Sequence, residues 1–291
     1  MKRLLILLFL IFVILVSGCM DQETLVVGPA ADGVVIKRFS FDSSTVYEGD
    51  TIGLNLEVQN VGEVDATLEE IRVYGGWGED IKLDLNEKLE ASEPEVDFEG
   101  EARSTRWKLN VSDVTAETTY SFGTRVVYKY STIYTGTLRV VTDTYLETLE
   151  EGERKSLLES GGVASSSVTG GPLSVKPMKG RNFIVSGMGW TTPVVFKLTN
   201  VGSGYPSSSS TINENTMYNV DILSCNGFTK CDSYGSTRLR LSQGKSRLFN
   251  CSFSITSPIV NKEDIIFSIT FDYYYYVDGT TPITVAPLPG I

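Results

Sequence analysis

The chain has 291 residues, with 36 acidic and 25 basic side chains, a hydrophobic content of 41% and no histidine. The absence of an imidazole excludes Ser-His-Asp triads, Cys-His dyads and His-ligated zinc or haem sites, because each needs a ring nitrogen that titrates near neutrality or binds metal. The length corresponds to about two domains of ~150 residues, and the hydrophobic content is that of a folded chain with sizeable cores. We expect a binding or structural protein, not an enzyme, with no cofactor and no metal.

The first residues have the pattern of an export signal. Two basic residues precede an unbroken apolar run of 13 residues, Leu4 to Val16, which is short for a membrane span of ~20 residues and typical of a signal-peptide core. The sequence Val-Ser-Gly-Cys at 16–19 resembles the lipobox of bacterial and archaeal lipoproteins. That resemblance implies a signal peptide over 1–18, lipidation of Cys19 and a tether over 19–32. An uncleaved N-terminal membrane anchor is the alternative, and both place the chain at the cell membrane, facing the extracellular side or the periplasm.

Charge is spread unevenly along the chain. Residues 19–160 carry 29 acidic and 13 basic side chains, whereas residues 161–291 carry 7 acidic and 10 basic ones. The acidic half has no basic stripe to neutralise phosphates, and the small positive charge of the other half is not clustered. We therefore expect no nucleic-acid partner.

The chain also repeats itself. An alternating apolar and polar run ends in Asn-Val-Gly at 60–62, and a second such run ends in Asn-Val-Gly at 200–202, which is 140 positions later. A second matched pair, over 126–140 and 269–285, follows in the same order and at nearly the same offset. Two matched pairs in one order indicate a diverged tandem duplication.

Within each unit, period-two runs rich in Val, Ile, Thr, Tyr and Phe recur between Gly, Asn, Asp and Ser turns, a pattern that predicts antiparallel β-sandwiches. Asp278-Gly279 between two such runs predicts a hairpin turn, because both residues tolerate positive φ. The sequence thus predicts an all-β protein with two immunoglobulin-like sandwiches in tandem, over 33–145 and 172–291. The predicted strands of the first unit are 34–41, 50–60, 66–74, 80–85, 102–110, 119–130 and 134–142. Those of the second are 172–178, 190–199, 217–224, 236–241, 246–256, 264–276 and 280–286.

The segments that flank one predicted strand of the first domain resemble those of a known family. Glu-Gly-Asp at 48–50 precedes one strand and Asn-Val-Gly at 60–62 follows it, which resembles the CARDB and S-layer-associated immunoglobulin-like repeats of prokaryotic, in particular archaeal, surface proteins. The match is weaker over 172–287, where Gly-Met-Gly-Trp at 187–190 replaces the Glu-Gly-Asp segment. The resemblance implies a cell-surface adhesion, spacer or assembly role and no catalytic residues.

Residues 146–171 form the predicted linker between the two domains. The leucines and good helix formers up to Ser160 favour a short amphipathic helix, although Gly152 weakens it by about 1 kcal/mol relative to alanine. The Gly/Ser-rich stretch from Gly161 to Gly171 has the composition of a flexible linker.

If Cys19 is lipidated, three cysteines remain, and an exported compartment permits a disulfide between two of them. Cys225 and Cys231 bracket a short loop, so we favour that pair. Pairing of either one with Cys251 is the alternative. A metal site of three thiolates is poorly supported because the spacing matches no common zinc signature.

Further candidate sites are modification and contact residues. Asn110 and Asn250 match the Asn-x-Ser acceptor pattern for N-glycosylation. Four consecutive tyrosines on a predicted strand alternate between its two faces, so two should enter the core and two should be exposed for contacts with sugars or proteins. These are Tyr273, Tyr274, Tyr275 and Tyr276. A run of acidic residues from Glu87 to Glu101 lacks a calcium-loop spacing and is expected to be a solvated loop.

Taken together, these patterns predict a membrane-anchored surface lipoprotein that serves in adhesion, spacing or envelope assembly, with an envelope protein or a glycan as partner. One alternative is an exported glycan-binding or carboxylate-dependent glycan-processing lipoprotein, which would need a concave aromatic and acidic cleft. A second alternative is an accessory subunit of a surface appendage, which exposed alternating apolar residues along a sheet edge would favour.

Overall fold

The computed structural model describes residues 32–78, 80–186 and 190–288. It confirms the all-β prediction: strands in several antiparallel sheets dominate, and helix is confined to short segments. The first strands are β1 (Val34–Phe41), β2 (Thr45–Tyr47), β3 (Thr51–Asn60), β4 (Ala66–Gly75), β5 (Ile81–Leu89), β6 (Ala102–Asn110) and β7 (Thr118–Thr142). They are followed by β8 (Val163–Val168), β9 (Leu173–Pro177), β10 (Ile184–Val185), β11 (Thr191–Asn200) and β12 (Tyr205–Ser207). The last strands are β13 (Asn219–Asn226), β14 (Lys230–Asp232), β15 (Arg238–Arg240), β16 (Ser246–Ser254) and β17 (Lys262–Ala286).

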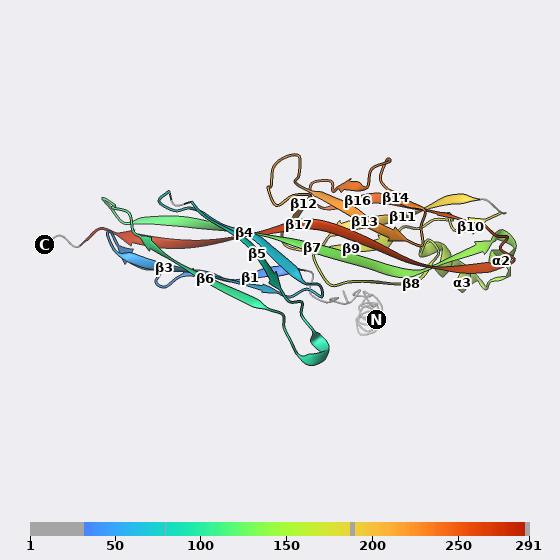
Figure 1. Cartoon of the computed structure of the whole chain (residues 1–291), viewed down its shortest axis with the longest axis horizontal. Helices are drawn as coiled ribbons and strands as arrows, with labels where there is room; N and C mark the ends of the chain where they lie inside the picture. Colours follow the sequence, from blue (N-terminus) through green and yellow to red (C-terminus); the bar gives the residue numbers. More distant parts are fainter. Residues whose placement is uncertain (1–31, 79, 187–189, 289–291) are drawn as a thin grey trace, which may run out of the picture.

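The strands form two sandwiches that share one large sheet (Figure 1). In the first sandwich the small sheet β1-β3-β6 packs on the β5-β4-β7 side of the large sheet. In the second sandwich the sheet β9-β11-β16-β14 packs on the β15-β13-β17 side. The two sandwiches therefore have the same strand order, except that β14 is added beyond β16. The tandem duplication itself stays a prediction.

A two-stranded ribbon joins the sandwiches. Strands β7 and β17 each have 25 residues and pair antiparallel from Lys262↔Val141 to Val285↔Thr118 without a register shift. At about 3.3 Å per residue the ribbon is roughly 80 Å long, and in Figure 1 it runs nearly the whole length of the elongated molecule.

The ribbon corrects the predicted strand breaks. The strands predicted over 119–130 and 134–142 are one strand, and so are those over 264–276 and 280–286. The predicted hairpin at Asp278-Gly279 is wrong: Gly279 does not adopt positive φ, and both residues pair across to β7. The carboxylate of Asp278 accepts two hydrogen bonds from Arg125 on that strand, at 2.7 Å each, so the polar residue satisfies a cross-strand ion pair instead of a turn.

Four buried tyrosines line the middle of the ribbon, which we call the waist. Tyr128 and Tyr130 of β7 lie opposite Tyr275 and Tyr273 of β17, and each ring is at most 2% exposed. Their aromatic contacts belong to one apolar cluster that continues from the first sandwich into the second. The core is thus continuous through the waist.

The predicted linker is structured. The expected helix is present as two short helices, α2 (Asp143–Thr148) and α3 (Glu151–Glu159), and Thr142 caps the first by accepting a hydrogen bond from the Tyr145 amide at 3.2 Å. The Gly/Ser-rich stretch, predicted to be flexible, instead contains β8, which pairs with β7 from Tyr134↔Val168 to Leu138↔Val163. It is ordered because its backbone satisfies the outer edge of β7, whose hydrogen-bonding groups would otherwise lack partners.

In the part of the chain that the structure describes, neither the length nor the apolar content of any helix suffices to cross a membrane.

Candidate functional site

A groove of about 710 Å³ lies on the outer face of the large sheet, beside the waist. Its floor comes from β4, β5 and β7 of the first sandwich. Its far wall is residues 210–212, in the loop between β12 and β13 of the second half. Period-two alternation sends the outer-facing side chains of these strands into the groove, because alternate residues of a strand point to opposite faces of its sheet. The lining residues are Glu70, Arg72, Tyr74, Asp80, Lys82, Arg125, Val127, Ser210, Thr211 and Ile212.

Ion pairs within and between β4 and β5 dominate the groove floor. Arg72 donates two hydrogen bonds to Asp80, at 2.9 and 2.7 Å, and this pairing holds the pKa of Asp80 below its usual value. Lys82 lies 2.8 Å from Asp84 and 3.1 Å from Glu70, and hydrogen bonds to these two carboxylates, Asp84 first, raise the pKa of Lys82. The floor therefore presents fixed, ionised donors and acceptors of both signs.

An arginine stacked on a tyrosine closes one side of the groove. The Arg125 guanidinium carbon lies 4.6 Å from the centre of the Tyr276 ring, within the range of a cation–π contact. Burial raises the pKa of Tyr276 to about 12, although the charge of Arg125 acts in the opposite direction. Because Arg125 also pairs with Asp278, its guanidinium plane is held in one orientation beside the groove.

Tyr74 supplies a flat aromatic surface in the groove. Its side chain is 37% exposed, and its ring lies against Gly123 of β7, where an added Cβ would overlap the ring. Glycine at this position leaves room for the Tyr74 ring beside the backbone of β7.

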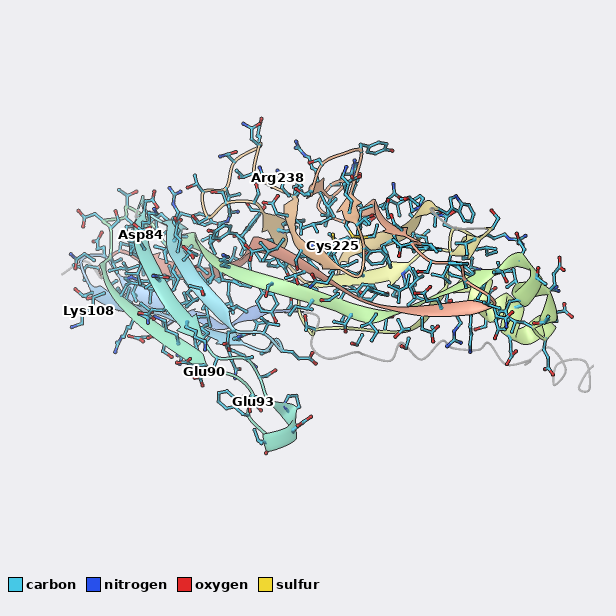
Figure 2. All side chains as sticks on the ribbon, turned by 45° about the vertical axis from the view of Figure 1, so that its right-hand side comes forward. Asp84, Glu90, Glu93, Lys108, Cys225 and Arg238 are labelled. Carbon is cyan, nitrogen blue, oxygen red and sulfur yellow. A yellow bond between two sulfur atoms is a disulfide. The ribbon has the colours of Figure 1, made fainter. Side chains whose placement is uncertain are left out.

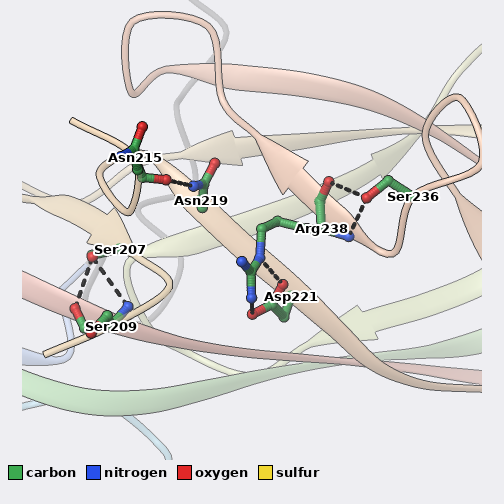
Figure 3. Close-up of polar contacts among 7 residues, drawn as sticks. All are labelled: Ser207, Ser209, Asn215, Asn219, Asp221, Ser236 and Arg238. Atoms are coloured by element: carbon green, nitrogen blue, oxygen red, sulfur yellow. Dashed lines mark hydrogen bonds and ion pairs between the residues drawn. The ribbon is translucent and has the colours of Figure 1, made fainter. Parts of the chain in front are cut away.

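The overhanging loop is held in place by hydrogen bonds from side chains to backbone (Figure 3). The Ser207 hydroxyl donates to the Ser209 carbonyl at 2.8 Å, and the Asn219 amide donates to the Asn215 carbonyl at 2.6 Å. Behind the loop, Arg238 and Asp221 form a two-point ion pair across β13 and β15 at 2.7 and 3.0 Å. Local turns of this kind order a loop without a core of its own, and they keep residues 210–212 beside the groove floor.

The chemistry available in the groove is hydrogen bonding, charge and ring stacking. General acid catalysis of glycoside cleavage needs a carboxyl with a raised pKa, whereas the pKa of Asp80 is lowered by Arg72. Among the described residues, no three His, Cys, Asp or Glu side chains gather as a metal ligand set.

Sequence reasoning missed this groove. The predicted strands 66–74 and 80–85 alternate apolar and polar residues, and several of the polar ones line the groove. Every sheet with one face in solvent shows the same alternation. Only the loop that stands over this part of the face distinguishes it.

The favoured disulfide is corrected by the structure. Cys231 of β14 and Cys251 of β16 lie directly opposite each other, with Cα atoms 4.0 Å apart, and form the disulfide, while Cys225 is a free thiol. The favoured pair, Cys225–Cys231, fails because β13 carries Cys225 in the large sheet, whereas the next loop takes the chain into the other sheet of the sandwich. The alternative pairing with Cys251 is confirmed for Cys231.

The four consecutive tyrosines are not the exposed contact surface that the sequence suggests. Tyr273 and Tyr275 enter the core, as alternation predicts, but Tyr276 is also buried, at 4% exposure, beneath Arg125 and Tyr205. Tyr274 alone is partly exposed. The prediction of two core and two exposed tyrosines is therefore wrong for Tyr276 alone, because the side chains of Arg125 and Tyr205 cover the outer face of β17 at this point.

The other predicted site residues lie on the surface or outside the described residues. Asn110 and Asn250 are both exposed, at the end of β6 and within β16, and their glycosylation stays a prediction. Cys19 and the proposed lipobox lie outside the described residues. The acidic run forms the hairpin between β5 and β6, including a single 3-10 turn, η1 (Pro94–Val96), and Figure 2 shows the labelled Glu90 and Glu93 on this projecting hairpin.

Comparisons with known proteins give no identity. No protein-family model matches the chain, and no curated protein matches it. Among solved structures, it is similar to the alkylpurine DNA glycosylase AlkC of Pseudomonas fluorescens bound to DNA containing an abasic site analogue, with 13% identity over 33% of this chain and 27% of that chain and a TM-score of 0.24. It is also similar to a red sea bream transglutaminase (11% identity, 85% of this chain, 31% of that chain, TM-score 0.18). A third similar structure is that of an Escherichia coli alpha-2-macroglobulin activated by porcine elastase (9% identity, 87% of this chain, 32% of that chain, TM-score 0.19). The chain spans less than a third of each of these chains, and at such TM-scores the likenesses carry no functional argument.

Proposed function

We propose that this protein is a lipid-anchored module of the cell surface that acts in adhesion or envelope assembly and displays its binding surfaces on one rigid, elongated body. The observation that carries the proposal is the ribbon of β7 and β17, which belongs to both sandwiches and pairs without a break. A hinge between two domains needs a segment with few contacts across it, and the ribbon and its tyrosine core occupy that position. Rigidity suits a body that presents a surface to a partner.

Hydrogen bonds across the waist support the same proposal. The Gly170 amide donates to the Glu63 carboxylate at 2.6 Å, and the Gly170 carbonyl accepts from the Tyr130 hydroxyl at 2.8 Å. On the other side of the ribbon, the Tyr275 hydroxyl donates to the Asn200 side chain at 2.8 Å. These bonds tie loops of both sandwiches to the shared ribbon.

The place where the proposed tether meets the folded body favours display over spacing. Asp32 lies at the waist, where its carboxylate accepts a hydrogen bond from the Ser203 amide at 2.7 Å, and the C-terminal end of β17 lies at one tip of the molecule (Figure 1). A spacer is expected to be held at one end. A body that is tethered at its waist presents both sandwiches to the surroundings.

Two measurements test the proposal. Detergent phase partitioning with metabolic lipid labelling should place the wild-type chain in the membrane phase and the Cys19→Ala variant in the aqueous phase; equal partitioning would contradict lipid anchoring. Rigidity is tested by energy transfer between dyes at Ser43→Cys and Glu151→Cys, two exposed positions near opposite ends, in a Cys225→Ser background. We expect one narrow distance distribution, and a broad or two-peaked one would contradict a rigid body.

A second candidate function is glycan binding in the groove, which the Tyr74 platform favours. Sugar rings stack on exposed aromatic faces while their hydroxyls bond to planar polar side chains, and Tyr74 lies among ionised side chains of both signs. A glycan array should then give hits that Tyr74→Ala removes and Gly123→Ala weakens by lifting the ring. Tyr47→Ala, which removes another exposed tyrosine outside the groove, is the matched control. Hits that survive Tyr74→Ala would exclude the groove.

A further inference from the structure

Strands β6 and β16 occupy equivalent places in the two sandwiches. In the first, Val58 pairs with Arg103 and Leu54 pairs with Trp107. In the second, Leu198 pairs with Arg247 and Val194 pairs with Cys251. Counted from the Asn-Val-Gly turn that ends each central strand, these pairs are at matching positions. Trp107 thus corresponds to Cys251.

The two strands differ on their outer sides. Strand β16 has β11 on one side and β14 on the other, where Lys230, Cys231 and Asp232 pair with its residues 252, 251 and 250. Strand β6 pairs with β3 alone, and no other backbone partner of residues 103–109 is present among the described residues. An edge strand presents a row of unpaired amides and carbonyls. The place that β14 fills in the second sandwich is empty in the first, opposite residues 106–108.

The side chains beneath that place are incompletely covered. At two equivalent inward-facing positions the strands differ: Phe249 and Cys251 of β16 are at most 1% exposed, whereas Thr105 and Trp107 of β6 are partly exposed. The positions on either side agree, because Leu109 and Phe253 are both buried and Arg103 and Arg247 are both partly exposed. Across the sandwich, the inward-facing residues of β5 repeat the pattern, because Ile81, Leu83 and Leu85 are partly exposed as well. The open side of the first sandwich therefore has an alternating apolar lining, with an ion pair between Arg103 and Glu87 at its hairpin end.

Two other edges of the small sheets carry backbone irregularities that β6 lacks, and the protective features of β6 are its charges, Arg103, Arg106 and Lys108. Strand β1 has a register shift between Ile36 and Arg38, and β9 ends in Pro177. Bulges and prolines are common devices against strand addition. The register of β6 against β3 runs from Thr51↔Asn110 to Gln59↔Ala102 without a shift, so its outer side is a regular template.

We propose that β6 is an acceptor edge, to which an extended segment of a partner protein adds as a further antiparallel or parallel strand, in the place that β14 fills in the other sandwich. This acceptor edge would be a binding site for the proposed adhesion or assembly function, and its biological setting rests on that proposal. Added strands gain affinity from main-chain hydrogen bonds and specificity from alternate side chains. The inward residues of the partner strand would cover Trp107, Leu83 and Leu85.

The exposed charges of β6 determine which outward-facing residues the partner strand should carry. Arg106 and Lys108 are exposed on the outer face of β6, as Figure 2 shows for the labelled Lys108. Arg106 forms an ion pair with Asp42, whereas Lys108 has no ion-pair partner among the described residues. Opposite charges across neighbouring strands stabilise a sheet and like charges directly opposite destabilise it. A second copy of β6 centred on Trp107 would place Lys108 opposite Arg106, so the fitting partner is an acidic, alternating strand from a different protein.

The test uses the full chain in detergent and a synthetic peptide of the length of β6 that alternates valine and glutamate. We expect saturable binding, slowed hydrogen exchange at the amides of residues 104–108, and no change in β1, β5 or β9. A peptide that alternates valine and lysine should bind at least about fivefold more weakly, and a glutamate peptide with a central proline should not bind, because proline lacks the amide donor.

Variants at exposed positions keep the test independent of folding. Lys108→Glu should weaken binding of the glutamate peptide by at least about fivefold and strengthen that of the lysine peptide. Lys197→Glu, on the outer face of the central strand β11, is the matched control and should change neither. Equal binding of all peptides, protection at another edge, or concentration-dependent self-association through β6 would each overturn the proposal. None of these outcomes depends on lipid attachment at Cys19, so failure here is distinct from failure of the membrane-anchoring proposal.

Discussion

The two sandwiches have one strand order but close their sides differently. In the second, β14 extends the small sheet and a disulfide fixes it to β16, so the aromatic side chains beneath are fully buried. In the first, only a short turn joins β4 to β5, the counterparts of β13 and β15, so no such strand is added and the side between β5 and β6 stays partly open. One topology thus gives a sealed core or an accessible edge, depending on a single short strand.

The two halves agree closely at their Asn-Val-Gly turns. In each, the asparagine Oδ1 accepts from the glycine amide two residues on, while its Nδ2 donates to a carbonyl four residues on. The valine and glycine amides both donate to one carbonyl, that of Gly33 in the first half and that of Pro172 in the second. The repeated motif is therefore a repeated turn, and it fixes the end of each central strand at the waist.

Alkaline unfolding should show the largest effect, and it tests whether the two sandwiches unfold as one cooperative unit. Burial raises the pKa of Tyr128, Tyr130, Tyr273 and Tyr275 above the ordinary value. Because the folded state favours the neutral phenol, this stability is complete below about pH 10 and is lost above it, at about 1.4 kcal/mol per pH unit for each tyrosine. We expect tyrosine ionisation, followed at 295 nm, to coincide with loss of β-sheet signal. In hydrogen exchange, the backbone amides of β3 and β11 should lose protection in one transition. Separate transitions would contradict a shared core.

Removing the disulfide tests the sealing of the second sandwich. Cys231 and Cys251 are 20 residues apart, and loss of a cross-link closing such a loop costs about 3 kcal/mol in the chain-entropy account. The Cys231→Ser, Cys251→Ser double variant should show this loss in urea unfolding. Cys225→Ser, which removes only the free thiol, should be near wild type, and an equal loss in both variants would contradict the assignment.

The equivalent asparagines provide a sharper comparison. Asn60 is fully buried and donates to two carbonyls, of Val64 and Leu89, whereas Asn200 is partly exposed and donates to one, of Gly204. Unsatisfied buried groups are costly, so Asn60→Ala should destabilise by about 2–3 kcal/mol and Asn200→Ala by about 1–2 kcal/mol. Chemical denaturation of both variants measures the difference, and the reverse order would show that the turns are not equivalent.

The smallest effect is expected from removing single hydroxyl groups from two neighbouring tyrosines of the waist. The Tyr130 hydroxyl donates to the Gly170 carbonyl and accepts from the Val64 amide, at 2.8 and 3.2 Å, whereas the Tyr128 hydroxyl has no hydrogen-bond partner among the described residues. Tyr130→Phe should therefore cost about 1–1.5 kcal/mol, and Tyr128→Phe should be neutral or slightly stabilising. Thermal unfolding of the two variants should differ accordingly; equal destabilisation would indicate that Tyr128 is also bonded.

Alternation located most of the long strands. The predicted strands 34–41 and 102–110 coincide with β1 and β6, and 66–74 differs from β4 by one residue. Most of the strands that escaped prediction, such as β12 and β14, have three residues or fewer, too few for a period of two to be seen. Strand β8 escaped because its serines have the composition of a linker.

The groove and the open edge could not be predicted in the same way. The predicted break near Ser131 and Thr132 shows why: polar residues there suggest a turn, yet Thr132 is buried and shares a 2.7 Å hydrogen bond with the Tyr273 hydroxyl from the other half of the chain. A polar residue at a turn and a polar residue with a distant partner have the same appearance in a sequence. The groove likewise needs a loop from one half and a sheet face from the other.

The sequence by itself determined the all-β class, the repeated Asn-Val-Gly turns and most strand positions, because these depend on local alternation and turn chemistry. Tertiary structure decided the rest. It merged four predicted strands into the β7–β17 ribbon, paired Cys231 with Cys251, buried Tyr276 and left β6 as a free edge. Each of these outcomes depends on which backbone lies alongside, and hydrogen-bond partners more than a hundred residues apart leave no mark on local periodicity.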